Sequence, residues 1–188
     1  MLPILRSRFD ELERQRRALL EELGSHSPAQ LAFRPSDRSW SMADVVQHLI
    51  LVEEGMLQFL TKKPPRPDNR SPAERLQYAM FKLLVQFPLR VKVPVPSVIP
   101  TVQATLEELS PRWDSVRARY EEYLSNVTEP QLSMLVFKHA FAGPVTILET
   151  LDVMRLHILH HGHQLRRIRA ANHFPAMEVA AAPAGARA

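Results

Sequence analysis

Residues 144–171 read PVTILETLDVMRLHILHHGHQLRRIRAA, and their apolar side chains recur with the 3.6-residue period of an α-helix. On a helical wheel with about 100° between successive residues, Ile147, Met154, Leu165 and Ile168 fall in one stripe, with Thr150 among them. A one-sided stripe is typical of a helix that packs against other helices. This segment therefore predicts a long helix from near Pro144 to about Ala171.

Four further helices are expected upstream, because similar patterns occupy residues 2–23, 42–60, 72–87 and 105–124. Three of them begin with a Ser or Thr followed three residues later by an acid, the signature of a capping box. These pairs are Ser41 with Asp44, Ser71 with Glu74, and Thr105 with Glu108. Pro111 either kinks the helix in which it lies or marks its true first turn after Ser110. No segment has the pattern of a β-hairpin or a βαβ unit.

The remaining segments are interpreted as connections. Four prolines exclude a regular helix over residues 88–100, and the alternating Val91, Val93 and Val95 favour an extended arm. The predicted fold is all-α: an antiparallel four-helix bundle with an extra short helix and a Pro-rich extended arm between helices 2 and 3. A single domain is expected over residues 1–174. Residues 175–188, rich in Ala and Pro, are expected to form a disordered tail.

Composition excludes several classes of protein. The 188 residues contain no cysteine, so disulfides, thiolate zinc sites and a cysteine nucleophile are excluded, and any thiol chemistry needs a thiol from a cosubstrate. No apolar run is long enough to span a bilayer, and the first residues do not resemble a signal peptide. A cytoplasmic location without a membrane partner follows as the expectation. The net charge is +4, but Arg and Glu are interspersed rather than arranged in a basic stripe, so no nucleic-acid partner is expected.

Two histidines stand out in the last predicted helix. His157 and His161 lie about 40° apart on the wheel, inside the apolar stripe, whereas His160 and His163 lie off it and are expected to face solvent or the rim. The spacing of four residues brings both imidazoles to one side of the helix, where they can share a metal ion. A pair of core histidines satisfied by other hydrogen bonds is the alternative, which the spacing leaves open.

A third ligand is expected from another helix, and His48 is the best candidate because it borders the apolar stripe of the helix at 42–60. The other histidines, His26, His139 and His173, lie in predicted connections or at a helix end. We expect them on the solvated surface. Trp40, just before the Ser41 cap, is expected to be a structural side chain that covers one end of the core.

Two motifs together resemble the DinB/YfiT-like superfamily, and in particular its DinB-like subgroup (DinB_2). The first is Arg34-Pro35, then residues 40–49 (WSMADVVQHL), with Glu53 five residues after the histidine. The second is residues 141–149 (FAGPVTILE), followed by the histidine pair and then Gln164. The resemblance covers most of the chain, from the first helix to about residue 170.

The resemblance implies a four-helix bundle that holds one divalent ion, zinc or nickel, on His48, His157 and His161. The family includes S-transferases that use low-molecular-weight thiols such as bacillithiol, a mycothiol-dependent isomerase and proteins described as metal-dependent hydrolases. A small-molecule substrate and a homodimer are therefore expected. The Asp that commonly follows the first histidine of the pair is Ile158 here, and Leu159 and His160 replace charged residues. These departures leave the ligands intact but put the residues around them in doubt.

Three functional hypotheses follow. The first is an enzyme that activates a thiol, or alternatively water, on an open metal position. The second is a non-catalytic module whose metal steadies the bundle or is sensed by it. The third is a dimerising scaffold whose arm at residues 91–100 packs on a partner.

Overall fold

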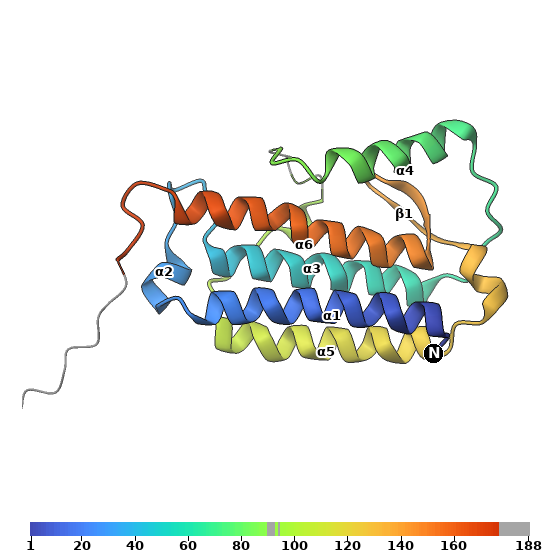
Figure 1. Ribbon diagram of the computed structural model, residues 1–188, viewed down its shortest axis with the longest axis horizontal. Helices are drawn as coiled ribbons and strands as arrows, with labels where there is room; N and C mark the ends of the chain where they lie inside the picture. Colours follow the sequence, from blue (N-terminus) through green and yellow to red (C-terminus); the bar gives the residue numbers. More distant parts are fainter. Residues whose placement is uncertain (90–92, 94, 177–188) are drawn as a thin grey trace, which may run out of the picture.

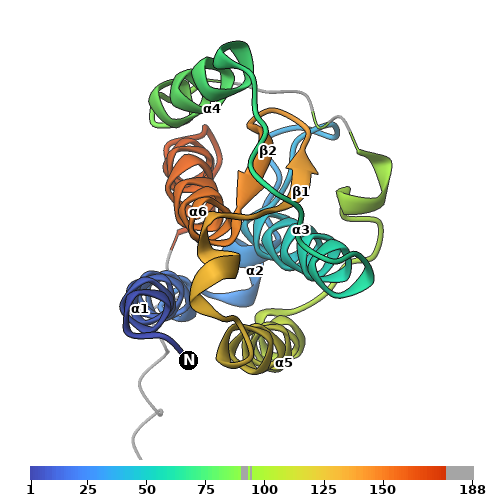
Figure 2. The same cartoon turned by 90° about the vertical axis from the view of Figure 1, so that its right-hand side faces the viewer.

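Four long helices form a bundle in the computed structural model, which describes residues 1–89, 93 and 95–176 (Figure 1). They are α1 (Pro3–Gly24), α3 (Met42–Lys62), α5 (Leu106–Ser125) and α6 (Ile147–Arg169). Figure 2, which looks along the bundle, shows the four helices around one core, with α4 (Pro72–Leu84) outside it. The predicted all-α four-helix bundle is confirmed.

The helices run in an up-down-down-up order. The colour gradient in Figure 1 shows α1 and α6 running one way and α3 and α5 the other. Contacts at the helix ends agree, because Arg8 of α1 pairs with Asp152 near the start of α6, and Glu22 pairs with Arg169 near its end. The two parallel helices α3 and α5 require a long connection between them, and α4 together with the chain up to residue 105 provides it.

Local capping chemistry starts the helices. Capping boxes form at Ser41–Asp44, Ser71–Glu74 and Thr105–Glu108, as predicted, because each hydroxyl and carboxylate satisfies backbone N–H groups that have no partner inside the helix. The box at Thr105 places the helix start at Leu106, so Pro111 lies inside α5 and does not mark its first turn.

The segment before α6 corrects the prediction that the chain has no hairpin. Strand β1 (Leu135–His139) pairs antiparallel with β2 (Gly143–Thr146), and Gly143 adopts a φ of 74°, which a residue without Cβ reaches without strain. Helix α6 therefore begins at Ile147, after the Thr146 cap, and not near Pro144. Pro144 resembles a proline in the first turn of a helix, but it lies in a strand, and only pairing with β1 decides this.

Three short helices complete the described chain. Helix α2 (Pro28–Ala32), which the sequence did not predict, lies in the 25–40 connection and is capped by Ser27. Two 3-10 helices, η1 (Pro96–Val98) and η2 (Glu129–Ser133), lie before and after α5. The predicted arm and tail fall partly outside the described residues, which omit 90–92, 94 and 177–188.

The bundle core is largely apolar, and a buried ion pair joins two of its helices. The carboxylate of Glu53 on α3 accepts hydrogen bonds from Trp113 Nε1 at 2.7 Å and Arg117 Nη2 at 2.6 Å, both on α5. The hydroxyl of Tyr120 donates to the Glu53 carbonyl at 2.9 Å. These bonds join α3 to α5. Among the described residues, no helix combines the length and the hydropathy that crossing a bilayer requires.

Candidate metal centre

Three imidazoles from two helices converge inside the bundle. His48 comes from α3, and His157 and His161 come from successive turns of α6. Their Nε2 atoms face one another, with His157 Nε2 at 3.3 Å from His48 Nε2 and at 3.0 Å from His161 Nε2. His48 and His161 are buried and His157 is half-buried. The structure thus brings together the three histidines that the sequence singled out, which we call the histidine triad.

Two acceptors orient the rings. His48 Nδ1 lies 2.7 Å from the carbonyl oxygen of Val98, and His161 Nδ1 lies 2.9 Å from Oε1 of Gln164. Because an oxygen of this kind only accepts, both Nδ1 atoms carry the proton, and both Nε2 atoms present a lone pair to the centre of the triad. If His157 carries its proton on Nε2, that one N–H cannot form good hydrogen bonds to the Nε2 atoms of both His48 and His161. A cation at the centre satisfies all three nitrogens.

The distances fit a metal ion. Two nitrogens bound tetrahedrally at about 2.0–2.1 Å from one zinc ion lie about 3.3–3.4 Å apart. The observed 3.3 Å and 3.0 Å are close to this separation, and all three ligand atoms lie within 4.8 Å of one another. Three imidazoles leave at least one coordination position free, which is typical of catalytic rather than structural sites.

Burial also sets the protonation state that a metal requires. Loss of hydration, together with the nearby His48, lowers the pKa of His161 to about 3. The pKa of His157 is well below its ordinary value, for the same reason and because two other imidazoles adjoin it. Burial lowers the pKa of His48 as well, against the hydrogen bond to Val98. All three rings are therefore neutral at pH 7, the form that binds a metal.

Trp40 forms one wall of the site. Its ring centroid lies 4.7 Å from that of His48 and 6.3 Å from that of His161, and the indole is nearly parallel to the latter ring, at 19°. The side chain is half-buried and packs on the edge of the core. Its structural role stays a prediction, and its ring lies beside two rings of the triad.

The neighbouring histidines of α6 point elsewhere. His160 Nδ1 lies 3.3 Å from the carbonyl oxygen of Val85, and His163 Nε2 lies 3.0 Å from that of Gln86. These carbonyls follow the end of α4, where helix carbonyls lack partners. Neither imidazole joins the triad, as the wheel predicted. Both side chains are half-buried beside the end of α4, in agreement with the expectation that they face solvent or the rim.

His139 departs from prediction. It is half-buried in the hairpin, and its Nδ1 accepts from the backbone N–H groups of Phe141 at 3.2 Å and Ala142 at 3.1 Å, which leaves the proton on Nε2. Burial lowers its pKa to about 4, and it is close enough to His157 to lower the pKa of that ring. Strand pairing buries His139, so the prediction of a solvated surface residue is wrong. His173 is exposed as expected, and His26 is half-buried.

Comparison with known proteins places the chain in a family. A family model described as the DinB superfamily matches residues 11–165. The chain belongs to the DinB superfamily. Metal binding is general in this superfamily, in agreement with the triad. No curated protein matches the sequence. The crystal structure of TT2238, described as a four-helix bundle protein, has a TM-score of 0.52 and 22% identity, over 87% of this chain and 97% of that one. At that identity the likeness shows the fold alone.

The motif residues of this DinB chain outside the triad support the helices that carry it. Arg34 Nη2 donates to the Asp44 carboxylate at 3.0 Å, next to the start of α3. Arg70 Nη1 donates to the Glu149 carboxylate at 2.8 Å, at the start of α6. These bonds pin the first turns of the two ligand helices. The sequence offered no signal for Val98, because its backbone carbonyl reaches His48 from fifty residues along the chain.

Proposed function

We propose that this DinB protein binds one divalent metal ion through Nε2 of His48, His157 and His161. We further propose that it is an enzyme that activates a low-molecular-weight thiol, or water, for transfer to a small electrophile. The observation that carries the proposal is the convergence of three neutral imidazoles with their Nε2 atoms 3.0–3.3 Å apart along the triad. When bound there, a divalent ion supplies Lewis acidity at its free position and lowers the pKa of whatever water or thiol occupies it.

The surrounding residues hold two rings of the triad in the form that binds a metal. The Val98 carbonyl and the Gln164 amide hold two rings in the tautomer that leaves Nε2 free. Trp40 lies against the same two rings and limits approach of solvent from its side. The capping boxes and the Arg34 and Arg70 bonds keep α3 and α6 in register, so the three nitrogens stay preorganised.

Thiol chemistry is preferred over hydrolysis on the family resemblance alone. The chain has no cysteine, so a sulfur nucleophile arrives with a cosubstrate and needs a group that holds it as thiolate. The first alternative is hydrolysis, with water instead of a thiol at the free position of the metal. The second alternative is a non-catalytic bundle that the metal stabilises.

Metal content tests the first step. Protein purified without a histidine tag is expected to contain about one divalent ion per chain, and His161→Ala to lose most of it. His163→Ala is the matched control, because that imidazole lies two residues further on α6 but bonds to Gln86. Loss of metal in His163→Ala and retention in His161→Ala contradicts the assignment of ligands.

Turnover tests the second step. Consumption of a low-molecular-weight thiol is measured against a panel of small electrophiles, and hydrolysis against a panel of esters and amides. His48→Ala is expected to abolish turnover while circular dichroism still reports a folded helical protein, because the core is apolar and does not depend on the ion. Unfolding of His48→Ala, or of the metal-free wild type, supports the structural reading of the metal instead.

A further inference from the structure

Helix α4 carries an apolar face that nothing else in the described chain covers. Leu76, Met80, Leu83, Leu84 and Phe87, here called the α4 face, are between 44% and 62% exposed. Leu89, just beyond, is 46% exposed. Figures 1 and 2 show α4 as the outermost helix, with only its inner side toward α6 and the hairpin. A cluster of this kind is larger than the scattered apolar residues of an ordinary surface.

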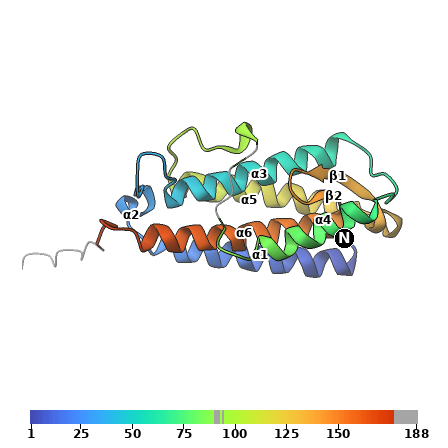
Figure 3. The ribbon, with the colours of Figure 1, turned by 90° about the horizontal axis from the view of Figure 1, so that it is seen from above.

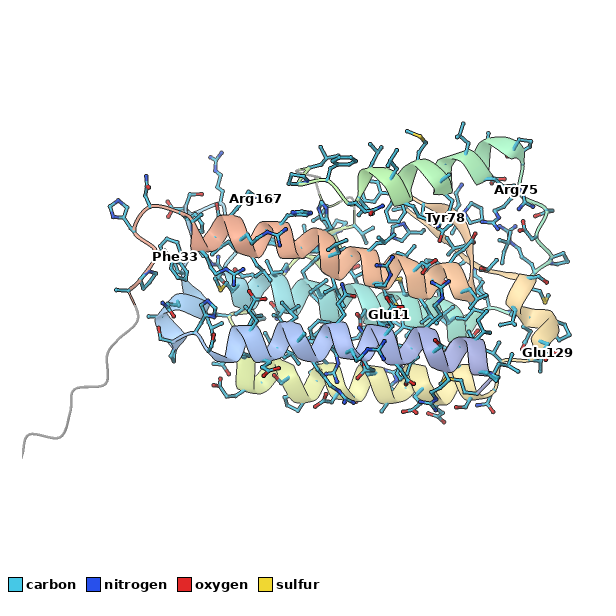
Figure 4. The ribbon with its side chains drawn as sticks, in the orientation of Figure 1. Glu11, Phe33, Arg75, Tyr78, Glu129 and Arg167 are labelled. Atoms are coloured by element: carbon cyan, nitrogen blue, oxygen red, sulfur yellow. The ribbon has the colours of Figure 1, made fainter. Side chains whose placement is uncertain are left out.

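The inner side of α4 already has its partners. Tyr78 is buried between α4 and the bundle (Figure 4). Phe81 packs on the ring of His139, with centroids 5.4 Å apart, and Gln77 Nε2 donates to the Phe141 carbonyl at 2.9 Å. The α4 face lies on the opposite side of the helix, so it takes no part in docking α4. Its exposure needs another explanation than local packing.

The spacing of the face matches a helix–helix seam. Leu76, Met80 and Leu83 are separated by four and three residues, as d and a positions are in a coiled coil, and Phe87 follows just beyond the end of α4 at Leu84. The positions of α4 that flank such a seam, normally charged, are Gln77, Ala79 and Leu84. An uncharged flank offers nothing to a charged partner and does not repel an identical helix.

The area suits a second copy of the chain. Six large side chains, each about half exposed, offer on the order of 500 Å² of apolar surface if a large side chain presents about 150–250 Å². Two copies would then bury on the order of 1,000 Å², the lower bound of a specific interface. A two-fold axis across the middle of the helix lets each face cover the other and leaves no apolar surface open for further addition.

We propose that two copies of this chain associate through the α4 face, as an antiparallel helix pair about a two-fold axis. Met80 of each copy then lies opposite Leu83 of the other, and Leu76 lies near the C-terminal end of the partner's α4. The end of this seam is attached to the triad helix through the bonds from His160 and His163 to the carbonyls of Val85 and Gln86. The inference does not depend on the proposed metal or activity.

Sedimentation of the full chain tests the association. The wild type is expected to sediment at twice the chain mass of 21.5 kDa at about 100 µM. Leu83→Glu and Met80→Glu each place a charge in the seam and are expected to weaken the dimer at least about a hundredfold. Val102→Glu is the matched control, because Val102 is 66% exposed outside the face, and it should leave the dimer intact. Circular dichroism checks that each variant is folded.

Cross-linking tests the orientation independently of those variants. Because the chain has no cysteine, Met80→Cys and Leu83→Cys each introduce a single thiol. A mixture of the two variants is expected to form the mixed disulfide in preference to either homodimer. A wild type that stays monomeric at about 100 µM overturns the proposal. So does a dimer insensitive to Leu83→Glu, or a monomer that binds anionic lipid vesicles through this face.

Discussion

Replacing Glu53 by Ala should destabilise the bundle more than replacing any other charged residue of α3 by Ala. The carboxylate is 2% exposed and accepts from Trp113 and Arg117. The guanidinium of Arg117 is equally buried, and its Nε and Nη1 atoms have no hydrogen-bond partner. Besides Glu53 at 2.6 Å it has a looser ion pair with Glu13 at 3.5 Å, so Glu53 provides its main compensation. Removing one member of a buried ion pair typically costs about 3–5 kcal/mol, because the other charge is left in a medium of low polarity. At about 2–4 °C per kcal/mol for a chain of this size, the melting temperature should fall by about 10 °C.

Urea unfolding followed by circular dichroism, in chelator to remove metal, measures the loss. Glu54→Ala is the control, because the adjacent Glu54 pairs with a more exposed partner, Arg112, and such surface pairs contribute about 0–1 kcal/mol. Glu53→Gln keeps an acceptor for Trp113 and is expected to lie between the two. If Glu53→Ala and Glu54→Ala differ by less than about 1 kcal/mol, the argument from the stranded guanidinium is refuted. Metal content should not change in any of the three variants, since Glu53 faces α5 and not the triad.

Three further predictions concern the surroundings of the triad. Gln164→Leu should weaken metal binding about 10- to 100-fold in a chelator competition, whereas Gln164→Glu, which keeps an acceptor for His161, should stay close to wild type; equal losses would remove Gln164 from ring orientation. The unfolded chain binds a proton at His139 below about pH 6.5, but the folded chain does so only near a pKa of about 4. The free energy of unfolding should therefore fall as the pH is lowered from about 6.5 to about 4, by at most about 1.4 kcal/mol per pH unit for this residue. The dependence of this free energy on pH should be weaker in His139→Asn, which keeps an acceptor for the turn. Identical dependences in the two proteins would contradict the assignment. Nickel or copper should quench the tryptophan fluorescence of the wild type but much less that of Trp40→Phe, because Trp40 lies beside the triad while Trp113 is buried at Glu53; unchanged quenching would place the metal elsewhere.

The helical bundle and the phase of α6 follow from the sequence because both rest on short-range interactions. A capping box joins residues three apart, and the apolar stripe of α6 depends only on the helical period. The wheel therefore separated His157 and His161 from His160 and His163 without knowledge of any neighbour. The same locality explains the successful starts of α3 at Ser41 and of α5 at Thr105.

Only the tertiary structure decided the features that depend on contacts between distant segments. The hairpin exists because residues 135–139 pair with residues 143–146, and that pairing overrides the helix-like start at Pro144 and buries His139. Figure 3 shows the chain that leads to α5 lying beside α3, and the Val98 carbonyl meets His48 there. A backbone acceptor has no side-chain identity, so no sequence pattern marks it. The α4 face is likewise exposed because no other described segment packs on it, although the spacing of its apolar residues is present in the sequence. A helical pattern determines which side chains share a face, but only the packing of the whole chain determines which faces are covered.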